Sequence, residues 1–532
     1  MRLTLAQGLS MGAKLNTLWP EIVLTVAAFK VMILGLNRLE WVRRSTFWIS
    51  LAALVVAACL TRVGSEHVTP LAQFMKLAIS LIGIALLAVA ADLPDESGTE
   101  PIQRSGRPFD PALTTRGEFF GFFLLSMAGA MLCAGADDLV WLFLALELTS
   151  LPTYILVAVS RQSIRAPEAG VKYFFLGAMA AGLFLYGFSL LYVATGSTDL
   201  GQIQQVIAKQ GFGGLALLGV LLSVLGIAFK IAAFPMHFYA ADVYEGAATP
   251  VSTFLAFVPK AAGFVSLILI LQAAGWGDSA NHRTLELVIW VMAVTTMFAG
   301  NTLALLQSNV KRVLAYSSVA HTGYMLVGLL VGPGKGAAGG LGDGVAAVLF
   351  YLVAYGVMTL GAFAVIGILR RSGEEAETFD DLRGLAQRRP GLAAALAVCV
   401  LSLTGIPPLV GFFGKFYLIA AAWSAGKGIL VCIMVANSAI AAYYYLRMFG
   451  VCYLQDPAPK TESAAAPARS WAAVASALAV VALSAAVGFL FEASIAAASP
   501  RPAAPASQAL ETSVPTSSPT PNLVGERPAP GS

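Results

Sequence analysis

The sequence has few residues of the kinds that hold metals or redox cofactors. Its five cysteines, Cys59, Cys133, Cys399, Cys432 and Cys452, stand apart with no C-x-x-C spacing, and its four histidines do not cluster. Isolated cysteines in apolar surroundings usually act as small buried hydrophobic residues. No G-x-G-x-x-G follows a strand, no cysteine set suits an iron–sulfur cluster, and no paired histidines suit a haem. We therefore expect no cofactor and no metal in this chain, so that electron transfer takes place elsewhere.

Charge is scarce as well, at 12% of 532 residues, about half the share usual in a soluble domain. Hydrophobic residues make up 58%, and the mean hydropathy is +0.77. Apolar segments of ~20 residues recur from end to end, each long enough to cross a hydrocarbon core of ~30 Å as a helix. The ~10-residue alternating segments of a membrane barrel are not seen. The sequence therefore predicts an all-α integral membrane protein.

The apolar pattern predicts fourteen transmembrane helices. They span residues 18–36, 47–63, 71–91, 117–134, 138–160, 168–194, 213–238, 249–273, 285–306, 313–332, 344–370, 391–424, 428–453 and 471–492. No A-x-A-like cleavage site follows the first span, which we treat as retained, with its Glu21 at the interface. The tail from Ser499 is rich in Pro, Ala and Ser and is predicted to be disordered.

Basic residues set the predicted orientation. Most loop lysines and arginines follow odd-numbered spans, in polar segments such as 92–116 and 371–390. Because Lys and Arg are preferentially kept on the cytoplasmic side, both termini are expected on the opposite, periplasmic side.

Two predicted spans contain residues that interrupt a helix. Span seven holds Pro235, and span twelve contains Gly405, Pro407 and Pro408 near its middle. Proline removes a backbone donor and clashes with the preceding turn, so both helices should break within the membrane. Breaks in corresponding positions of two halves are typical of transporters built from inverted repeats. Each break also lies close to a lysine, Lys230 or Lys415.

Four ionisable residues lie deep in apolar segments: Glu147, Lys230, Lys260 and Lys415. A charge near the bilayer centre costs at least roughly 2.5 kcal/mol on insertion scales, so such residues usually face the protein interior and mark ion pathways. Burial favours a neutral lysine, whereas a nearby carboxylate favours a charged one. A Glu–Lys pair of variable separation is therefore a proton switch, although a static structural pair remains the alternative.

Three further residues are weaker candidates. Lys172 is either an anchor at the interface or part of a charge relay, and His237 is either a relay or an interfacial residue. His321 lies ten residues beyond Lys311, near mid-membrane, and we favour a relay. We read Asp242, Tyr244 and Glu245 as a solvated turn between spans seven and eight.

Three stretches resemble one family. FKIAAFPMHFYAADVYEGAATPVSTFLAFVPKAAGF at 229–264, KRVLAYSSVAHTGYM at 311–325 and LTGIPPLVGFFGKFYL at 403–418 are similar to the antiporter-like membrane subunits of respiratory complex I and of multisubunit cation/proton antiporters. The resemblance covers roughly 137–450. One departure is Pro259 directly before Lys260, which we expect to distort span eight locally.

The resemblance implies two inverted five-helix repeats and hence a division into parts. These are three leading helices and a loop (1–116), a first repeat (117–273), a second repeat (274–453), a final helix (454–498) and the disordered tail (499–532). It implies that Glu147 and Lys230 form a coupling pair, that Lys260 and His321 connect the halves, and that Lys415 is the exit-side site. Lys172 matches an extra lysine on the sixth helix.

Among the complex I subunits of this family, the N type matches best. Lys415 stands where the M type usually has glutamate, and the long lateral helix of the L type is absent. The implied partners are M-type and K-type membrane neighbours, with NADH, FMN, iron–sulfur clusters and quinone in partner subunits. We expect a proton-translocating subunit in a bacterial inner membrane. The rivals are a cation/proton antiporter subunit, a membrane acyl or glycosyl transferase, and a purely structural assembly subunit.

Overall fold

The computed structural model describes residues 16–63, 68–91, 116–161, 163–276, 279–334, 340–371, 374–457, 461–463, 466–499 and 531. The predicted disordered tail therefore lies outside the described residues, apart from Ser499 and Gly531. Residues up to Ser499 form one unit, and it is this unit that contains the membrane helices.

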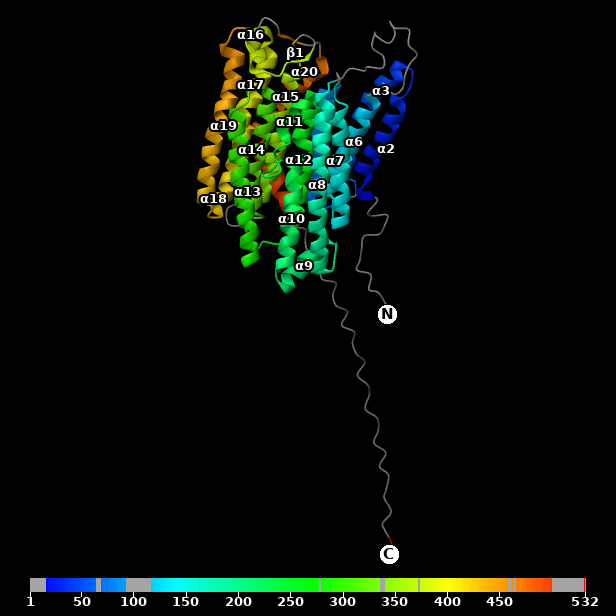
Figure 1. Ribbon diagram of the computed structural model, residues 1–532, viewed down its shortest axis with the longest axis vertical. Helices are drawn as coiled ribbons and strands as arrows, with labels where there is room; N and C mark the ends of the chain where they lie inside the picture. The colour runs from blue at the N-terminus through cyan, green and yellow to red at the C-terminus, as the bar shows by residue number, and fades with distance from the viewer. Residues whose placement is uncertain are drawn as a thin grey trace. The chain divides into compact units, whose positions relative to one another are not determined.

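Helices make up nearly all of this unit (Figure 1). The leading helices are α2 (Trp19–Gly35), α3 (Glu40–Leu60) and α4 (Pro70–Ala90). Then follow α6 (Arg116–Ala134), α7 (Leu139–Ala158), α8 (Arg165–Thr195), α9 (Leu200–Gln210), α10 (Gly214–Lys230), α11 (Ala240–Gly246) and α12 (Thr249–Ala274). The remainder comprises α13 (Ala280–Leu305), α14 (Val310–Val331), α15 (Gly344–Ile366), α16 (Leu385–Arg388), α17 (Pro390–Thr404), α18 (Val410–Ser424), α19 (Gly428–Leu454), α20 (Pro467–Ala485) and α21 (Val487–Ala498).

All fourteen predicted spans correspond to helices, and the fold class is confirmed. Eleven helices among the described residues are long and apolar enough to cross a membrane. The largest boundary error is at the end of span seven, predicted at residue 238, because the second helical segment of that span, α11, ends eight residues later at Gly246. Helix α3 begins seven residues earlier than predicted, because the polar residues of its first turns are helical but do not add to the apolar pattern. The predicted last span is also divided, into α20 and α21.

The structure adds elements that hydropathy does not predict. The amphipathic helix α9 joins spans six and seven. The polar loop after span eleven contains strands β1 (Leu369–Arg371) and β2 (Glu374–Glu375) and a 3-10 turn (Phe379–Leu382). Strand β3 (Thr461–Ser463) pairs with β1, giving a sheet of order β2-β1-β3. Apart from Leu369 and Arg370 of β1, which fall within predicted span eleven, these short elements lie outside the predicted apolar spans.

Both predicted helix breaks are present. Span seven is divided into α10 and α11, and Ala232 in the break has a positive φ of 54°. Span twelve is divided into α17 and α18, with Gly405 at a φ of 90° directly after α17. Backbone carbonyls at the ends of α10 and α17 therefore have no partner within their own helix and are available to side chains.

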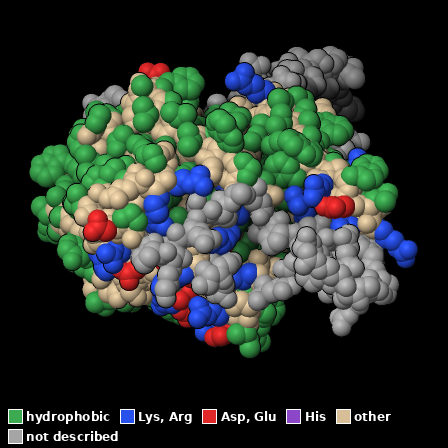
Figure 2. Space-filling model, turned by 90° about the horizontal axis from the view of Figure 1, so that it is seen from above, with side chains coloured by type: hydrophobic (Ala, Val, Ile, Leu, Met, Phe, Trp, Pro, Cys, Tyr) green, Lys and Arg blue, Asp and Glu red, His purple; other side chains and the backbone are tan. Residues whose placement is uncertain are grey.

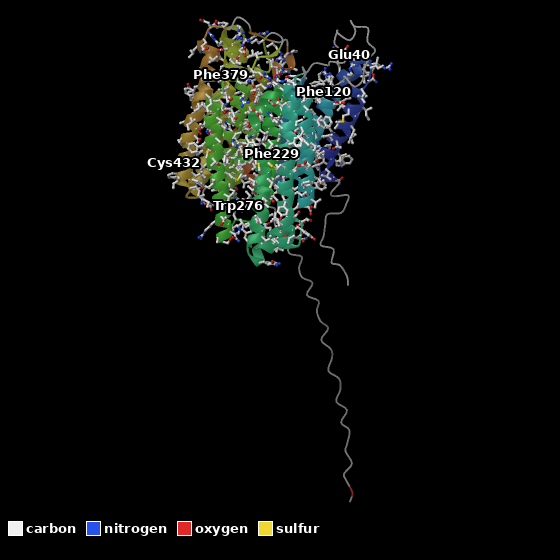
Figure 3. All side chains as sticks on the ribbon, viewed as in Figure 1. Glu40, Phe120, Phe229, Trp276, Phe379 and Cys432 are labelled. Carbon is white, nitrogen blue, oxygen red and sulfur yellow. The ribbon has the colours of Figure 1, made fainter. Side chains whose placement is uncertain are left out.

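Helices α7 and α14 begin in the same way at opposite ends of the bundle. Asp138 caps α7 and pairs through the backbone with Asp199, which precedes α9. Asn309 caps α14 and pairs with Thr378, which precedes the turn that starts at Phe379. Helix α9 and Phe379 lie at opposite ends of the molecule (Figures 1 and 3). The matched contacts agree with an inverted repeat, while the boundaries 117–273 and 274–453 stay a prediction.

The core is centred on three helices. In an apolar 18-residue stretch of each helix, the share of residues that are buried is 100% in α14, 94% in α12 and 89% in α15. The share is only 33% in α8 and α19. The outer helices instead carry exposed large hydrophobic side chains such as Phe175 and Tyr443. Seen from above, basic and acidic side chains lie across the end of the molecule, and hydrophobic side chains border much of it (Figure 2). The deep ionisable residues therefore lie inside the bundle.

Candidate functional site

The Glu147–Lys230 pair forms where α7 meets the end of α10. Lys230 is the last residue of α10, and its Nζ lies 3.5 Å from Glu147 Oε1. The lysine side chain is 2% exposed and the glutamate 19%. Lys230 also donates to the hydroxyl of Ser150, one turn beyond Glu147 on the same helix. The structure thus brings the two predicted residues together, with a neutral hydroxyl as an alternative partner for the amine.

Glu147 lies on the outward face of its helix. Leu144 and Leu151, one turn to either side, are 60% and 49% exposed. Glu147 is therefore the most exposed of the deep residues Glu147, Lys230, Lys260, His321 and Lys415, which together are called the buried line below.

Lys260 is held by neutral oxygens. Its Nζ donates to the backbone carbonyls of Ile231 at 3.1 Å and Ser318 at 2.7 Å, and to Thr322 Oγ1 at 2.5 Å. Ile231 directly follows α10, so the break supplies one of these carbonyls. Carbonyls at a helix C-terminus carry partial negative charge and stabilise a cation. Helix α12 continues past Pro259 without interruption. The local distortion expected beside Lys260 stays a prediction.

His321 sits among tyrosines at the centre of the second half. Its Nδ1 lies 2.6 Å from the hydroxyl of Tyr351, and its Nε2 lies 2.8 Å from that of Tyr445. Tyr445 in turn contacts the hydroxyl of Ser317. Both ring nitrogens therefore have a hydroxyl partner that can either donate or accept a proton.

Lys415 repeats at the second break the arrangement of Lys260 at the first. Its Nζ donates to the carbonyl of Thr404, the last residue of α17, at 2.8 Å. It also lies 5.1 Å from the ring centroid of Tyr324, which contacts His321 edge-on at 5.6 Å. An aromatic ring thus separates the histidine from the last lysine of the line.

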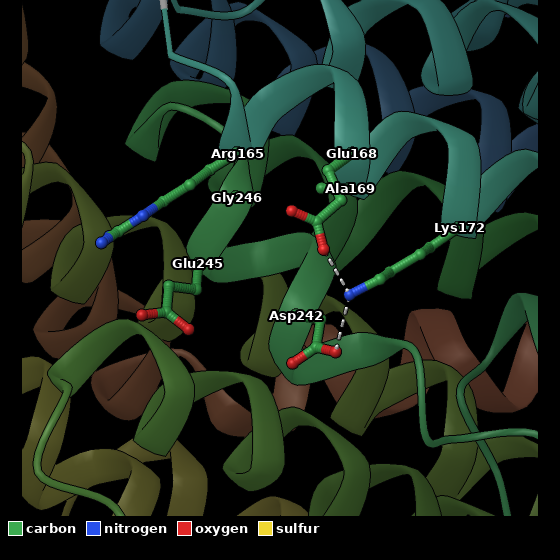
Figure 4. A pocket seen from close by; sticks show the side chains of 7 residues that line it. All are labelled: Arg165, Glu168, Ala169, Lys172, Asp242, Glu245 and Gly246. Carbon is green, nitrogen blue, oxygen red and sulfur yellow. Dashed lines mark ion pairs between the residues drawn. The ribbon is translucent and has the colours of Figure 1, made fainter.

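Lys172 and His237 lie apart from this line. Lys172 is exposed near the start of α8 and pairs with Glu168 at 2.8 Å and Asp242 at 3.7 Å (Figure 4). The ring of His237 rests against Phe234, and its Nδ1 is buried without a hydrogen-bond partner among the described residues. The structure therefore places neither residue in contact with the deep lysines.

Two sequence-based interpretations are wrong. Glu21 is not interfacial, because its side chain is buried and pairs with Lys76 of α4 at 2.7 Å. The lysine supplies the counter-charge that allows the carboxylate to lie inside the bundle. Asp242, Tyr244 and Glu245 are not a solvated turn but part of α11, where Tyr244 is buried. Arg312 reaches both Asp242 and Glu245 at 2.8 Å and so anchors this short helix.

Sequence reasoning also missed two sets of buried polar side chains, one structural and one beside His321. Lys76 stands in the run PLAQFMKLAISLIGIALLAVA, where the criterion that singled out Lys230 would have found it. The tyrosines around His321 carry no charge, so an argument from buried charge could not find them.

An ionic cluster joins the two halves at the start of α12. Lys311, fully buried at the start of α14, pairs with Glu375 at 3.4 Å and Glu377 at 3.1 Å. Glu375 also accepts from the backbone N–H and hydroxyl of Thr249 at the start of α12. Burial raises the pKa of Glu375, but the Lys311 charge and the Thr249 hydrogen bond outweigh it and leave the pKa below its usual value.

No group of three or more His, Cys, Asp or Glu side chains in the described part of the chain could hold a metal ion. The ionisable and polar groups that the described residues place inside the bundle include amines, carboxylates, imidazoles and hydroxyls. These are groups that bind and release protons.

Comparisons with known proteins agree with this arrangement. Residues 136–441 match the family model described as NADH:quinone oxidoreductase/Mrp antiporter, TM. The NADH-quinone oxidoreductase subunit N of Halorhodospira halophila is 38% identical over 457 residues, covering 84% of this chain and 90% of the relative. That of Trichlorobacter lovleyi is 38% identical over 453 residues, covering 83% and 88%.

Solved structures give the same result. A chain of respiratory complex I from Thermus thermophilus is similar with a TM-score of 0.73 and 30% identity, covering 90% of this chain and 99% of that one. A chain of the Mrp complex from Dietzia shares the fold, with a TM-score of 0.74, 22% identity and coverage of 92% and 97%.

Proposed function

Since this chain belongs to the family of NADH:quinone oxidoreductase and Mrp antiporter membrane subunits, we propose that it is the N-type subunit of a bacterial NADH:quinone oxidoreductase and translocates protons. Most of the chain aligns with curated subunits of that name. The single observation that carries the transport role is the line of buried proton-binding groups from Glu147 to Lys415.

The partners of the three lysines in that line support a relay. Only Lys230 has a carboxylate partner, whereas Lys260 and Lys415 are held by backbone carbonyls and hydroxyls. A buried lysine with a counter-ion remains charged, while one without a counter-ion is poised to give its proton away. A positive charge on one lysine of the line therefore changes the free energy of protonating the next lysine.

The proposed cycle begins at Glu147. A change in the neighbouring subunit moves this carboxylate toward or away from Lys230, whose amine can fall back on the Ser150 hydroxyl. The released proton passes to Lys260, then along the His321 hydroxyl cluster to Lys415. We place its exit on the periplasmic side, with both termini on that side of a bacterial inner membrane.

The redox chemistry belongs to partner subunits under this proposal. NADH, FMN, iron–sulfur clusters and quinone would be bound there, and M-type and K-type membrane subunits would flank this chain. Its own contribution is the enzyme's proton translocation, driven by quinone reduction in its neighbours.

The test is Lys230→Ala in the intact complex. Inverted membrane vesicles are assayed for assembly, NADH oxidation and NADH-driven acidification. We expect a normally assembled complex whose proton pumping falls at least about tenfold, since a positioned proton-transfer group usually contributes 10²-fold or more. The matched control is Lys209→Ala, which removes an exposed lysine from α9. Normal pumping by Lys230→Ala would defeat the proposal.

The family description also names Mrp antiporters, which leaves cation/proton exchange without electron transfer as the second candidate. Co-purification decides between them. Redox subunits in the purified complex support the first reading, whereas sodium-dependent proton exchange without NADH supports the second.

A further inference from the structure

Two glycines bring α13 and α14 into backbone contact in the second half of the bundle. An added Cβ at Gly300 of α13 would lie 2.5 Å from a backbone nitrogen of α14. One at Gly323 of α14 would lie 2.7 Å from a backbone nitrogen of α13. Each glycine directly precedes a buried polar residue, Asn301 or Tyr324. The close approach of the two helices therefore puts the Asn301 amide within reach of the Tyr324 side chain.

The side chain of Asn301 joins three helices. Its Nδ2 donates to the hydroxyl oxygen of Tyr324 at 3.1 Å, and to Oδ1 and the backbone carbonyl of Asn437 at 3.1 and 3.2 Å. Its Oδ1 accepts from the hydroxyl of Tyr444 at 3.0 Å. Asn437 and Tyr444 belong to α19, and both asparagines are 0% exposed. The amide thus uses donor and acceptor together, and a satisfied buried polar network gives its side chains a single position.

Tyr324 is the member of this network that lies next to the buried line. The Lys415 amine lies over its ring, 5.1 Å from the centroid, and the ring meets that of His321 edge-on at 5.6 Å. A cation over the face of an aromatic ring is attracted by the ring quadrupole, and more strongly where water is excluded. The ring therefore favours the charged form of an amine that is otherwise held by the carbonyl of Thr404.

Other titratable side chains of the neighbouring helices surround the same place. They are His321 of α14, which interacts electrostatically with Lys415, Tyr351 of α15, which packs against Gly414, and Tyr444 and Tyr445 of α19. In the contacts of the described residues, Tyr324 is the one group that both meets the Lys415 amine and is held by Asn301. A change at Asn301 should therefore reach the amine through this ring.

We propose that Asn301 is a positioning residue of the proton pathway: by holding the hydroxyl of Tyr324, it keeps the face of that ring on the Lys415 amine. A tyrosine ring swings about its Cα–Cβ bond, and a hydrogen bond at the far end of the ring stops this motion. The proposal rests on the proposed function above. It assigns a residue of α13 to the control of the last lysine in the buried line.

The test is Asn301→Leu in the intact complex, which keeps a branched side chain of similar length and removes its hydrogen bonds. Assembly and NADH-driven pumping per assembled complex are measured in inverted vesicles over a series of pH values. Tyr324→Phe removes only the hydroxyl that Asn301 holds, and Tyr324→Leu removes the ring. The matched control is Asn281→Leu, which takes from the same helix an asparagine whose amide donates to the carbonyl of Phe212.

We expect pumping to decline at a lower pH in Asn301→Leu than in the wild type, because an amine that has lost the ring face keeps its proton less well. Tyr324→Leu should move the decline by about one pH unit, since a desolvated cation–π contact favours the charged form roughly tenfold or more. Tyr324→Phe should move it less, because its ring remains but is no longer held. Asn281→Leu should keep the wild-type profile.

The double variant Asn301→Leu/Tyr324→Leu shows whether Asn301 acts through the ring. Its pumping should decline at the same pH as that of Tyr324→Leu, because the ring is already absent. A further shift, as large as that of Asn301→Leu alone, would overturn the proposal. A wild-type profile in Asn301→Leu would also overturn it, and so would a loss by the same factor at every pH, which marks a packing defect.

The proposal stays open to refutation if Asn301→Leu does not assemble. Tyr324→Phe and Tyr324→Leu are then compared, and identical pH profiles would show that the ring face does not act on the amine. Normal pumping in Lys230→Ala would overturn the proposed function itself, so the two failures are distinguishable.

Discussion

Glu21 and Lys76 form a buried ion pair well before the family-matched region begins. Lys76 Nζ lies 2.7 Å from Glu21 Oε1, and each side chain is 3% exposed. The lysine also donates to the carbonyl of Thr17 at 2.9 Å. The pair joins α2 to α4, whereas the family model matches only from residue 136. We therefore assign it to holding the leading helices together and not to the proton path.

Breaking one partner of this pair should loosen the leading helices. Lys76→Met leaves the Glu21 carboxylate buried without a counter-charge, which typically costs about 3–5 kcal/mol. We expect the variant complex to lose this subunit at a lower temperature in detergent. The measurement is the midpoint of its thermal release, followed by gel electrophoresis of the remaining complex.

The double variant Glu21→Gln/Lys76→Met separates charge from packing. Removing both charges avoids the uncompensated carboxylate, so most of the loss in midpoint should be recovered. A double variant no more stable than Lys76→Met would contradict the assignment. Complex that remains assembled should pump at the wild-type rate in both cases.

Glu147→Gln tests the other buried pair by its effect on transport. The substitution keeps the shape and removes the charge that lies 3.5 Å from Lys230. Because the substitution removes the carboxylate that favours a charged amine, and a positioned proton-transfer group usually contributes 10²-fold or more, transport should slow at least about tenfold. We expect NADH-driven pumping to fall by at least that factor in vesicles.

Glu286→Gln is the matched control for this prediction. Glu286 pairs with Lys427 near the ends of α13 and α19, with 43% of its side chain exposed. Exposed ion pairs contribute little, so the control should assemble and pump normally. Equal pumping by the two variants would show that the Glu147 charge is not needed.

Hydropathy and buried charge predicted most of this arrangement. Lys230 and Lys415 stood out because an amine in an apolar run is costly unless it faces the interior. The prolines near them located both breaks because a proline cannot donate the helix hydrogen bond. The carbonyl of Ile231 that binds Lys260 could not be predicted, since it depends on how α10 packs against α12.

The side chains that complete the site were hidden for a different reason. Tyr351 and Tyr445 look like ordinary core aromatics in sequence, and only the fold places their hydroxyls on His321. Glu375 was assigned to a polar loop, yet its carboxylate accepts a hydrogen bond from the hydroxyl of Thr249 at the start of α12. Such contacts join residues far apart in the chain, so no local pattern reports them.

Glu375 should make stability depend on pH. Its pKa is lowered in the folded protein, so its contribution is fully present above the unfolded value near 4.5 and is lost as the pH falls through the lower folded value. We expect the wild-type thermal midpoint to exceed that of Glu375→Gln at neutral pH. The difference should shrink only in the acid range below the unfolded value. A difference that vanishes already at neutral pH would contradict the ion pair with Lys311.

Gly405→Ala should impair the last lysine of the line. Gly405 has a φ of 90°, and an added Cβ would lie 3.1 Å from Lys415 Cδ and 3.4 Å from its Nζ. A left-handed backbone costs an alanine roughly 1–2 kcal/mol, and the methyl group also pushes against the stem that carries the amine to Thr404.

The matched control is Gly426→Ala, because Gly426 has a φ of 74° and nothing lies within 4 Å of its added Cβ. Both variants bear the backbone cost, so both should show a similar small drop in thermal midpoint, but only Gly405→Ala should also slow NADH-driven pumping per assembled complex. Equal pumping by the two variants would mean that the position of the Lys415 amine beside the break does not matter to transport.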